Sequence, residues 1–204
     1  MYEEYPEYSE KQIEIWRKRL AAYLKPQRLA HCERVAALAF EMAARHGLNP
    51  AQARAAGILH DVARDLPGNA DFHLYFAIAA SHGIPVGPAE RANPLILHAP
   101  VGAVLLAEQW GLADPVLLAA VAGHTIASPD MADFTKLIYL ADSAEPGREW
   151  EGAAKLRSLM AENLDAAMLY ALETMSPWLA ERGLPMHPLA QEAYEYFKRR
   201  SHFG

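Results

Sequence analysis

The stretch Gly57-Ile58-Leu59-His60-Asp61-Val62-Ala63 places two adjacent polar side chains inside an otherwise apolar run. Water would not reach such a buried segment, so His60 and Asp61 need another partner, and a metal ion is one. The doublet alone is weak evidence, because nine His and eight Asp in 204 residues give about 0.35 such pairs by chance. The interpretation therefore depends on similar residues elsewhere in the chain.

The sequence around the doublet has the pattern of α-helices. Asn49 and Pro50 suit an N-cap and a first helical position, which predicts a helix that carries His60 and Asp61 and ends at Pro67-Gly68. Apolar residues at helical spacing recur along the rest of the chain, and no alternating strand pattern is found. The predicted fold class is therefore all-α, in a single helical bundle.

The sequence also predicts that the protein is divided into two parts. A first helix opens at Ser9, which with Gln12 resembles a capping box, and Lys25-Pro26 ends this segment. We expect an N-terminal helical extension over residues 1–24 and the main domain over residues 25–200. A length of 204 residues is enough for one domain with a sizeable core.

Other histidines and aspartates lie on or beside apolar helical faces. His31 precedes three apolar residues by four, seven and eleven positions, which places it on the inward stripe of its helix. Asp142 follows Ile138 by one turn, His124 follows an apolar stretch at helical spacing, and His98 stands at the start of a helix. A buried aspartate without a partner would be costly, so these residues predict a shared site.

Each of these residues also has a simpler interpretation. A single inward histidine often bonds a backbone carbonyl, and Asp142 or His98 could act at a helix end. Asp61 could pair with Arg64 on its own helix. Cys32, beside His31, suits a small buried apolar residue better than a nucleophile.

The joint pattern favours a metal site over these separate interpretations. The four candidate ligands offer mixed nitrogen and oxygen atoms, which suit iron, manganese or zinc: they are His31, His60, Asp61 and Asp142. The absence of cysteine ligands argues against a closed structural zinc site.

Composition excludes several classes of function. The formal net charge of -6 argues against binding to nucleic acid polymers, which requires a basic face. A single cysteine indicates a reducing compartment, and no signal peptide or apolar run of membrane-spanning length is seen. We therefore expect a cytoplasmic protein without a membrane partner.

The motifs around the candidate ligands resemble those of a known family. The segments are Arg28-Leu29-Ala30-His31, Leu59-His60-Asp61-Val62-Ala63-Arg64-Asp65-Leu66-Pro67, Leu97-His98-Ala99-Pro100-Val101-Gly102-Ala103, His124-Thr125, Lys136-Leu137-Ile138-Tyr139-Leu140-Ala141-Asp142, Glu145-Pro146-Gly147-Arg148 and Met186-His187-Pro188. Together they resemble the HD-domain phosphohydrolase superfamily, and within it the YqeK group of bacterial symmetrical diadenosine tetraphosphate hydrolases. The resemblance covers about residues 25 to 198.

The resemblance implies a role for each matching residue, within a single HD-domain bundle. The implied metal ligands are His31, His60, Asp61 and Asp142. The implied substrate contacts are Arg28, Asp61, Val62, Ala63, Arg64, His98, His124, Thr125, Asp142, Arg148, Met186, His187 and Pro188. The implied catalytic residues are Asp61, Arg64, His98 and His124, although His98 and His124 could instead bind a second metal.

The resemblance implies hydrolysis of diadenosine tetraphosphate to two ADP molecules by a metal-activated water. Iron is the implied metal, with manganese and zinc as alternatives, and the implied partner is a dinucleoside polyphosphate. By resemblance alone a homodimer is an expected state. Three alternatives stay open: an HD phosphohydrolase for nucleoside mono-, di- or triphosphates, a non-catalytic nucleotide sensor, and a helical interaction module without a metal.

Overall fold

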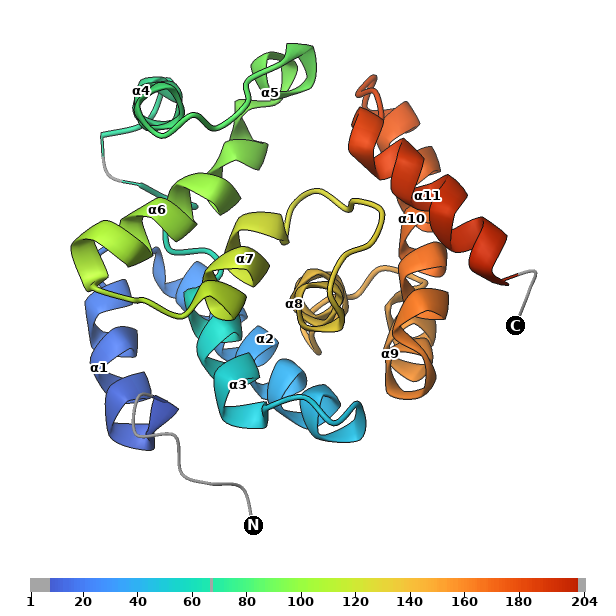
Figure 1. Ribbon diagram of the computed structural model, residues 1–204, viewed down its shortest axis with the longest axis horizontal. Helices are drawn as coiled ribbons and strands as arrows, with labels where there is room; N and C mark the ends of the chain where they lie inside the picture. Colours follow the sequence, from blue (N-terminus) through green and yellow to red (C-terminus); the bar gives the residue numbers. More distant parts are fainter. Residues whose placement is uncertain (1–7, 67, 202–204) are drawn as a thin grey trace.

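The computed structural model describes residues 8–66 and 68–201, and within these residues every regular element is helical. Figure 1 shows them as a bundle of helices that cross at varied angles. The elements are α1 (Glu10–Leu20), α2 (Pro26–Arg45), α3 (Pro50–Leu59), α4 (His73–Ser81), α5 (Pro88–Ala92), the 3-10 helix η2 (Pro94–Leu97), α6 (His98–Trp110), α7 (Pro115–Gly123), α8 (Asp133–Ala144), α9 (Ala153–Glu162), α10 (Leu164–Glu181) and α11 (Pro188–Ser201). The predicted all-α class is confirmed.

Helix α8 lies at the centre of the bundle and packs against α2, α3, α7, α9 and α10 (Figure 1). Leu137, Ile138 and Leu140 of this helix are completely buried. Burial of each such side chain stabilises the fold by about 1.5–3 kcal/mol. Asp142, near the end of this central helix, and Glu145, just after it, lie close to the candidate ligands of α2 and of the turn after α3. Packing of the core therefore also sets the geometry of the site.

The helix that precedes the doublet ends earlier than the sequence suggested. Asn49 caps α3 as predicted, with its side chain accepting from two backbone N–H groups, but α3 ends at Leu59. His60 and Asp61 therefore lie in the turns that follow, where backbone bonds join residues three apart, such as Val62 N–H to Leu59 O at 3.0 Å. These tighter turns replace the helical bonds. Pro67, the predicted breaker, lies outside the described residues.

The N-terminal helix α1 begins at the predicted cap, since the Ser9 hydroxyl accepts from the Gln12 backbone N–H. It packs against α3. Residues 1–7 of the expected extension lie outside the described residues, and the division at residue 24 stays a prediction. No helix in the described part of the chain combines the length and apolar character needed to cross a membrane.

Gly57 allows α2 and α3 to approach each other closely. A Cβ atom at this position would lie 2.6 Å from the Ala36 Cα and 2.8 Å from the Ala36 backbone nitrogen. Backbone atoms in a packed helix cannot move aside as a flexible side chain can. The glycine therefore brings the helix before the doublet against the helix that carries His31.

We expect Gly57→Ala to lower the free energy of unfolding by about 3 kcal/mol, because the two helices must separate. Chemical denaturation measures the change. Gly102→Ala is a matched control in α6, because its new Cβ would meet side chains and no backbone, the nearest being Val62 at 3.1 Å, and the loss should be smaller. A Gly57→Ala protein as stable as the wild type would show that the close approach is not needed.

Candidate metal centre and active site

Four buried histidines share one arrangement, in which Nδ1 faces an acceptor of the protein and Nε2 faces the interior of the site. The contacts of Nδ1 are His31 to Glu145 Oε1 (3.1 Å), His60 to Gly57 O (2.8 Å), His98 to Leu95 O (2.6 Å) and His124 to Val121 O (2.7 Å). An acceptor at Nδ1 holds the ring proton there, so Nε2 keeps its lone pair. This is the arrangement of histidines that bind metal ions.

A first cluster joins α2, the turn after α3 and the end of α8. His31 Nε2 lies 2.9 Å from Asp142 Oδ1 and 3.8 Å from Asp61 Oδ2, and His60 Nε2 lies 3.4 Å from Asp61 Oδ2. The Nε2 atoms of His31 and His60 are buried and have no hydrogen-bonding partner among the described residues. Buried nitrogen lone pairs that converge with carboxylate oxygens are suited to bind a cation.

A second cluster lies on the other side of the same carboxylate. Asp61 Oδ1 is 2.9 Å from His98 Nε2 and 3.7 Å from His124 Nε2, and these two nitrogens are 3.0 Å apart. If both imidazoles are neutral and carry their proton on Nδ1, the lone pairs of the two Nε2 atoms point toward each other. A cation between them and Asp61 removes this conflict, so Asp61 has the position of a bridging ligand.

The spacing of these atoms fits ligation of a divalent ion. Ligand atoms about 2.1 Å from a common ion lie about 3.0–3.4 Å from one another in octahedral or tetrahedral geometry. The contacts among the candidate ligands span 2.9 to 3.9 Å. Both groups of three, His31 with His60 and Asp142, and Asp61 with His98 and His124, have every ligand atom within 4.8 Å of the others.

The protonation states of Asp61 and His124 also suit metal binding. Burial raises the pKa of Asp61, but the nearby imidazoles of His60, His124 and His98 outweigh this effect and hold the pKa well below the usual range. Burial lowers the pKa of His124. An ionised carboxylate and a neutral imidazole are the forms that bind a metal ion.

Three arginines surround the clusters. Arg28 Nη1 donates to Asp61 Oδ2 at 3.0 Å, and Arg148 donates to Asp142 Oδ1 at 2.8 Å. Asp61 thus pairs with Arg28 of α2, and the alternative of a pair with Arg64 is wrong. Arg64 has no side-chain partner among the described residues and lines the cavity over the clusters. Its guanidinium is available to an anion such as a phosphate.

Glu145, which the sequence did not assign to the site, positions His31. Its carboxylate is 1% exposed, accepts from His31 Nδ1, and receives two hydrogen bonds from Arg34 at 2.5 and 3.0 Å. Burial raises its pKa, but the hydrogen bonds from Arg34 and His31 outweigh this effect and lower the pKa to about 2. Its place three residues after Asp142, in a matched motif, was the one available sign in the sequence.

We expect Glu145→Gln to weaken metal binding by about 10- to 100-fold, because a neutral amide replaces the charged acceptor that orients the His31 ring. Competition with a chelator of known affinity measures the change. Glu90→Gln is a matched control, because Glu90 is also buried and also contacts a histidine, His187, but lies outside both clusters. Equal metal affinity in the two variants would contradict the positioning role.

The clusters open into a cavity of about 230 Å³. It places several predicted residues together, since its lining includes Arg64, His98, His124, Thr125 and Asp142. An apolar pocket continues from it between η2, α8 and α10, and His187 lies on its wall. Val62 and Ala63 are fully buried, and they line neither cavity; nor do Met186 and Pro188.

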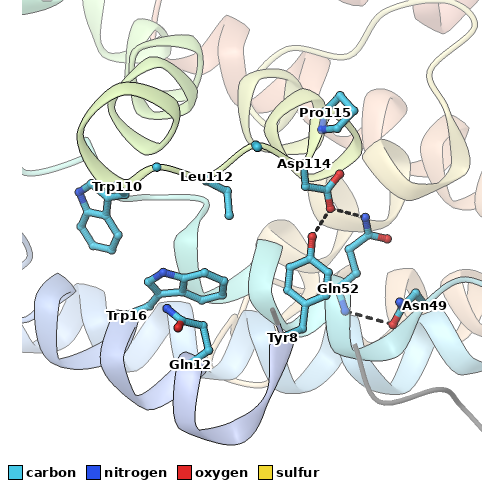
Figure 2. Close-up of a pocket in the computed structure, with 11 residues that line it drawn as sticks. Tyr8, Gln12, Trp16, Asn49, Gln52, Trp110, Leu112, Asp114 and Pro115 are labelled. Carbon is cyan, nitrogen blue, oxygen red and sulfur yellow. Dashed lines mark hydrogen bonds between the residues drawn. The ribbon is translucent and has the colours of Figure 1, made fainter. Parts of the chain in front are cut away.

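A larger cavity of about 830 Å³ lies away from the clusters, between α1 and the connection from α6 to α7 (Figure 2). Its one carboxylate, Asp114, already accepts from Tyr8, from Gln52 at 2.5 Å and from two backbone N–H groups of α7. The described residues that line it include no histidine. These bonds join α1, α3 and α7, and the cavity lacks the groups needed for hydrolysis.

Comparison with known proteins agrees with this geometry. A family model described as "HD domain" matches residues 28–147. The chain is 32% identical to the symmetrical bis(5'-nucleosyl)-tetraphosphatase of Bacillus subtilis and 30% identical to that of Halalkalibacterium halodurans, in each case over 81% of this chain and 86% of the relative. A crystal structure of a predicted HD superfamily hydrolase involved in NAD metabolism, from Clostridium acetobutylicum, has a TM-score of 0.85 at 30% identity. That match covers 94% of this chain and 98% of that one.

Proposed function

The chain belongs to the HD domain family, and on this premise we propose that it is a metal-dependent phosphohydrolase that cleaves diadenosine tetraphosphate symmetrically into two ADP molecules. The observation that carries the proposal is the set of converging Nε2 and carboxylate atoms beneath an open cavity. The names of the two relatives supply the substrate.

We propose two divalent ions, with iron as the metal. The first cluster would hold one ion through His31, His60, Asp61 and Asp142. The second would hold another through Asp61, His98 and His124. Ions bound at these residues would lower the pKa of a water molecule to near neutrality and polarise a phosphoryl oxygen.

The arginines would neutralise the polyphosphate. Arg64, which has no partner within the described residues, would bind a phosphate oxygen directly. Arg28 donates from Nη1 to Asp61, and Arg148 donates from Nη2 to the Asp142 carboxylate and from Nε to the Asp142 backbone oxygen. The remaining N–H groups of both guanidiniums would bind the substrate. The apolar pocket beside the clusters, of about 80 Å³, would contact part of the nucleoside of the same half of the substrate.

Symmetrical cleavage has a simple atom balance. The oxygen of water forms a bond to one of the two central phosphorus atoms, and the bond from that phosphorus to the oxygen that bridges the two central phosphates breaks. Each half leaves as ADP, and the water protons go to the products and the medium. In labelled water, one oxygen-18 atom should appear in half of the ADP molecules, on the terminal phosphate.

The products of the metal-replete protein test this function. Chromatography should show ADP alone from diadenosine tetraphosphate, and kcat/KM for this substrate should exceed that for nucleoside mono-, di- and triphosphates. Equal amounts of ATP and AMP, or faster turnover of a mononucleotide, would overturn the proposal in favour of another phosphohydrolase.

We expect Arg64→Ala to lower kcat/KM on the order of 10²-fold, because it removes a charge-assisted contact to the polyphosphate. Metal content should stay at the wild-type level, since the Arg64 guanidinium makes no hydrogen bond or ion pair with a candidate ligand among the described residues, and its backbone bond to Asp61 O is kept in the variant. Arg54→Ala is a suitable control, because its guanidinium pairs with Glu10 on the α1 side of the molecule. Steady-state kinetics on both variants separates the site effect from a general charge effect.

A further inference from the structure

Tyr139 lies where the polar cavity over the clusters meets the apolar pocket. Its side chain lines both, together with Thr125 and Met175. It comes from the central helix α8, one turn before Asp142. A group at this position faces the junction of the phosphate-binding and nucleoside-binding regions of the proposed substrate.

The Tyr139 hydroxyl is an unpaired donor in the interior. The residue is 3% exposed, and its oxygen has no hydrogen-bonding partner within residues 8–66 and 68–201. Burial of an unpaired hydroxyl costs about 1–3 kcal/mol. Burial and the nearby charge of Asp142 raise the pKa of Tyr139, so the phenol keeps its proton and can donate.

Tyr75 is a buried tyrosine whose hydroxyl has a structural role. It is 1% exposed, and its hydroxyl donates to the Ala63 backbone oxygen at 2.6 Å. The Thr125 hydroxyl, next to Tyr139 on the cavity wall, also has a backbone partner, the Ile96 oxygen at 3.0 Å. The unpaired Tyr139 hydroxyl on the same wall is therefore available to a bound ligand.

We propose that the Tyr139 hydroxyl donates a hydrogen bond to the phosphate attached to the ribose of the bound half of the substrate. This bond would fix the position of the nucleotide relative to the two cavities. This inference rests on the proposed function in taking the ligand to be an adenine nucleotide. It makes Tyr139 a substrate-binding residue whose hydroxyl does not stabilise the protein in the absence of substrate.

The test compares Tyr139→Phe with Tyr75→Phe, using calorimetric titration with ADP and with adenosine, and thermal unfolding. Loss of one hydrogen bond to a charged phosphate should raise the Kd for ADP of Tyr139→Phe about tenfold or more. The Kd for adenosine should stay at the wild-type value. Tyr139→Phe should unfold at or above the wild-type temperature, whereas Tyr75→Phe should unfold at a lower temperature.

An unchanged Kd for ADP, or a loss of stability in Tyr139→Phe equal to that in Tyr75→Phe, would overturn the inference. A weakened Kd for adenosine would place the contact on the nucleoside and overturn the phosphate assignment. Binding of ADP does not depend on turnover, so a wild-type protein that binds ADP but leaves diadenosine tetraphosphate intact would refute the proposed function alone. A wild-type protein that binds no ADP would refute both.

Discussion

Replacing Asp61 with alanine should lower kcat for diadenosine tetraphosphate by at least about 10⁴-fold and remove most of the bound metal. One oxygen of this carboxylate faces His31 and His60, and the other faces His98 and His124. A single substitution therefore takes a ligand from both clusters. Steady-state kinetics and elemental analysis of anaerobically purified protein measure the two effects.

Asp65→Ala is the matched control for this substitution. Asp65 belongs to the same turn segment and accepts from the Lys25 backbone N–H at 3.3 Å, but it is in neither cluster. It should keep its metal and nearly full activity. If Asp61→Ala keeps its metal and more than a tenth of the wild-type kcat while circular dichroism shows the native helix content, the bridging role of Asp61 is wrong.

Replacing His124 with alanine should reduce the bound metal from two ions to one per chain and lower kcat by about 10³-fold. Its Nε2 lies 3.0 Å from His98 Nε2 and faces Asp61, whereas the first cluster does not use it. The first ion should therefore remain. Elemental analysis gives the stoichiometry, and turnover of the same sample gives kcat.

His82→Ala is the control for loss of an imidazole. His82 pairs with Glu108 at 2.9 Å on the α4 side of the molecule, and its loss should change neither metal content nor kcat. If His124→Ala keeps two ions while its kcat falls, the residue acts on phosphate and not on a metal ion. His98→Ala provides a second variant at the same cluster and should give the same stoichiometry.

Much of the candidate site could be predicted from helical periodicity. His31 and Asp142 stand on inward stripes of α2 and α8, and both stripes are buried in the structure as their apolar neighbours require. The sequence also predicts that His60 and Asp61 lie inside a helix, and this prediction is wrong. The bonds between residues three apart that end α3 at Leu59 depend on tertiary packing, which no local residue preference encodes.

Two parts of the site could not be predicted from helical periodicity. Glu145 lies just after α8, where no apolar stripe marks a side chain as inward, and only the contact with His31 from another helix reveals its role. The apolar pocket combines Ile126, Leu179 and Leu184, which come from segments far apart in the chain. Their meeting depends on how α10 packs against α8, and so on the whole fold.

The roles of the arginines follow from contacts that the sequence could only suggest. The resemblance implies that Arg28 and Arg148 contact the substrate, and in the structure each also donates to a carboxylate of the first cluster. They would keep Asp61 and Asp142 ionised and oriented for a metal ion before it binds. Arg64 differs from both in having no partner among the described residues, and this difference makes it the stronger candidate for direct contact with phosphate.

Removal and return of the metal tests the central claim most directly. Protein treated with a chelator should lose all hydrolysis of diadenosine tetraphosphate. Addition of Fe²⁺, with Mn²⁺ and Zn²⁺ in parallel, should restore it as up to two ions bind per chain, with ADP as the only product. Full activity in protein shown by elemental analysis to be free of metal would contradict the account.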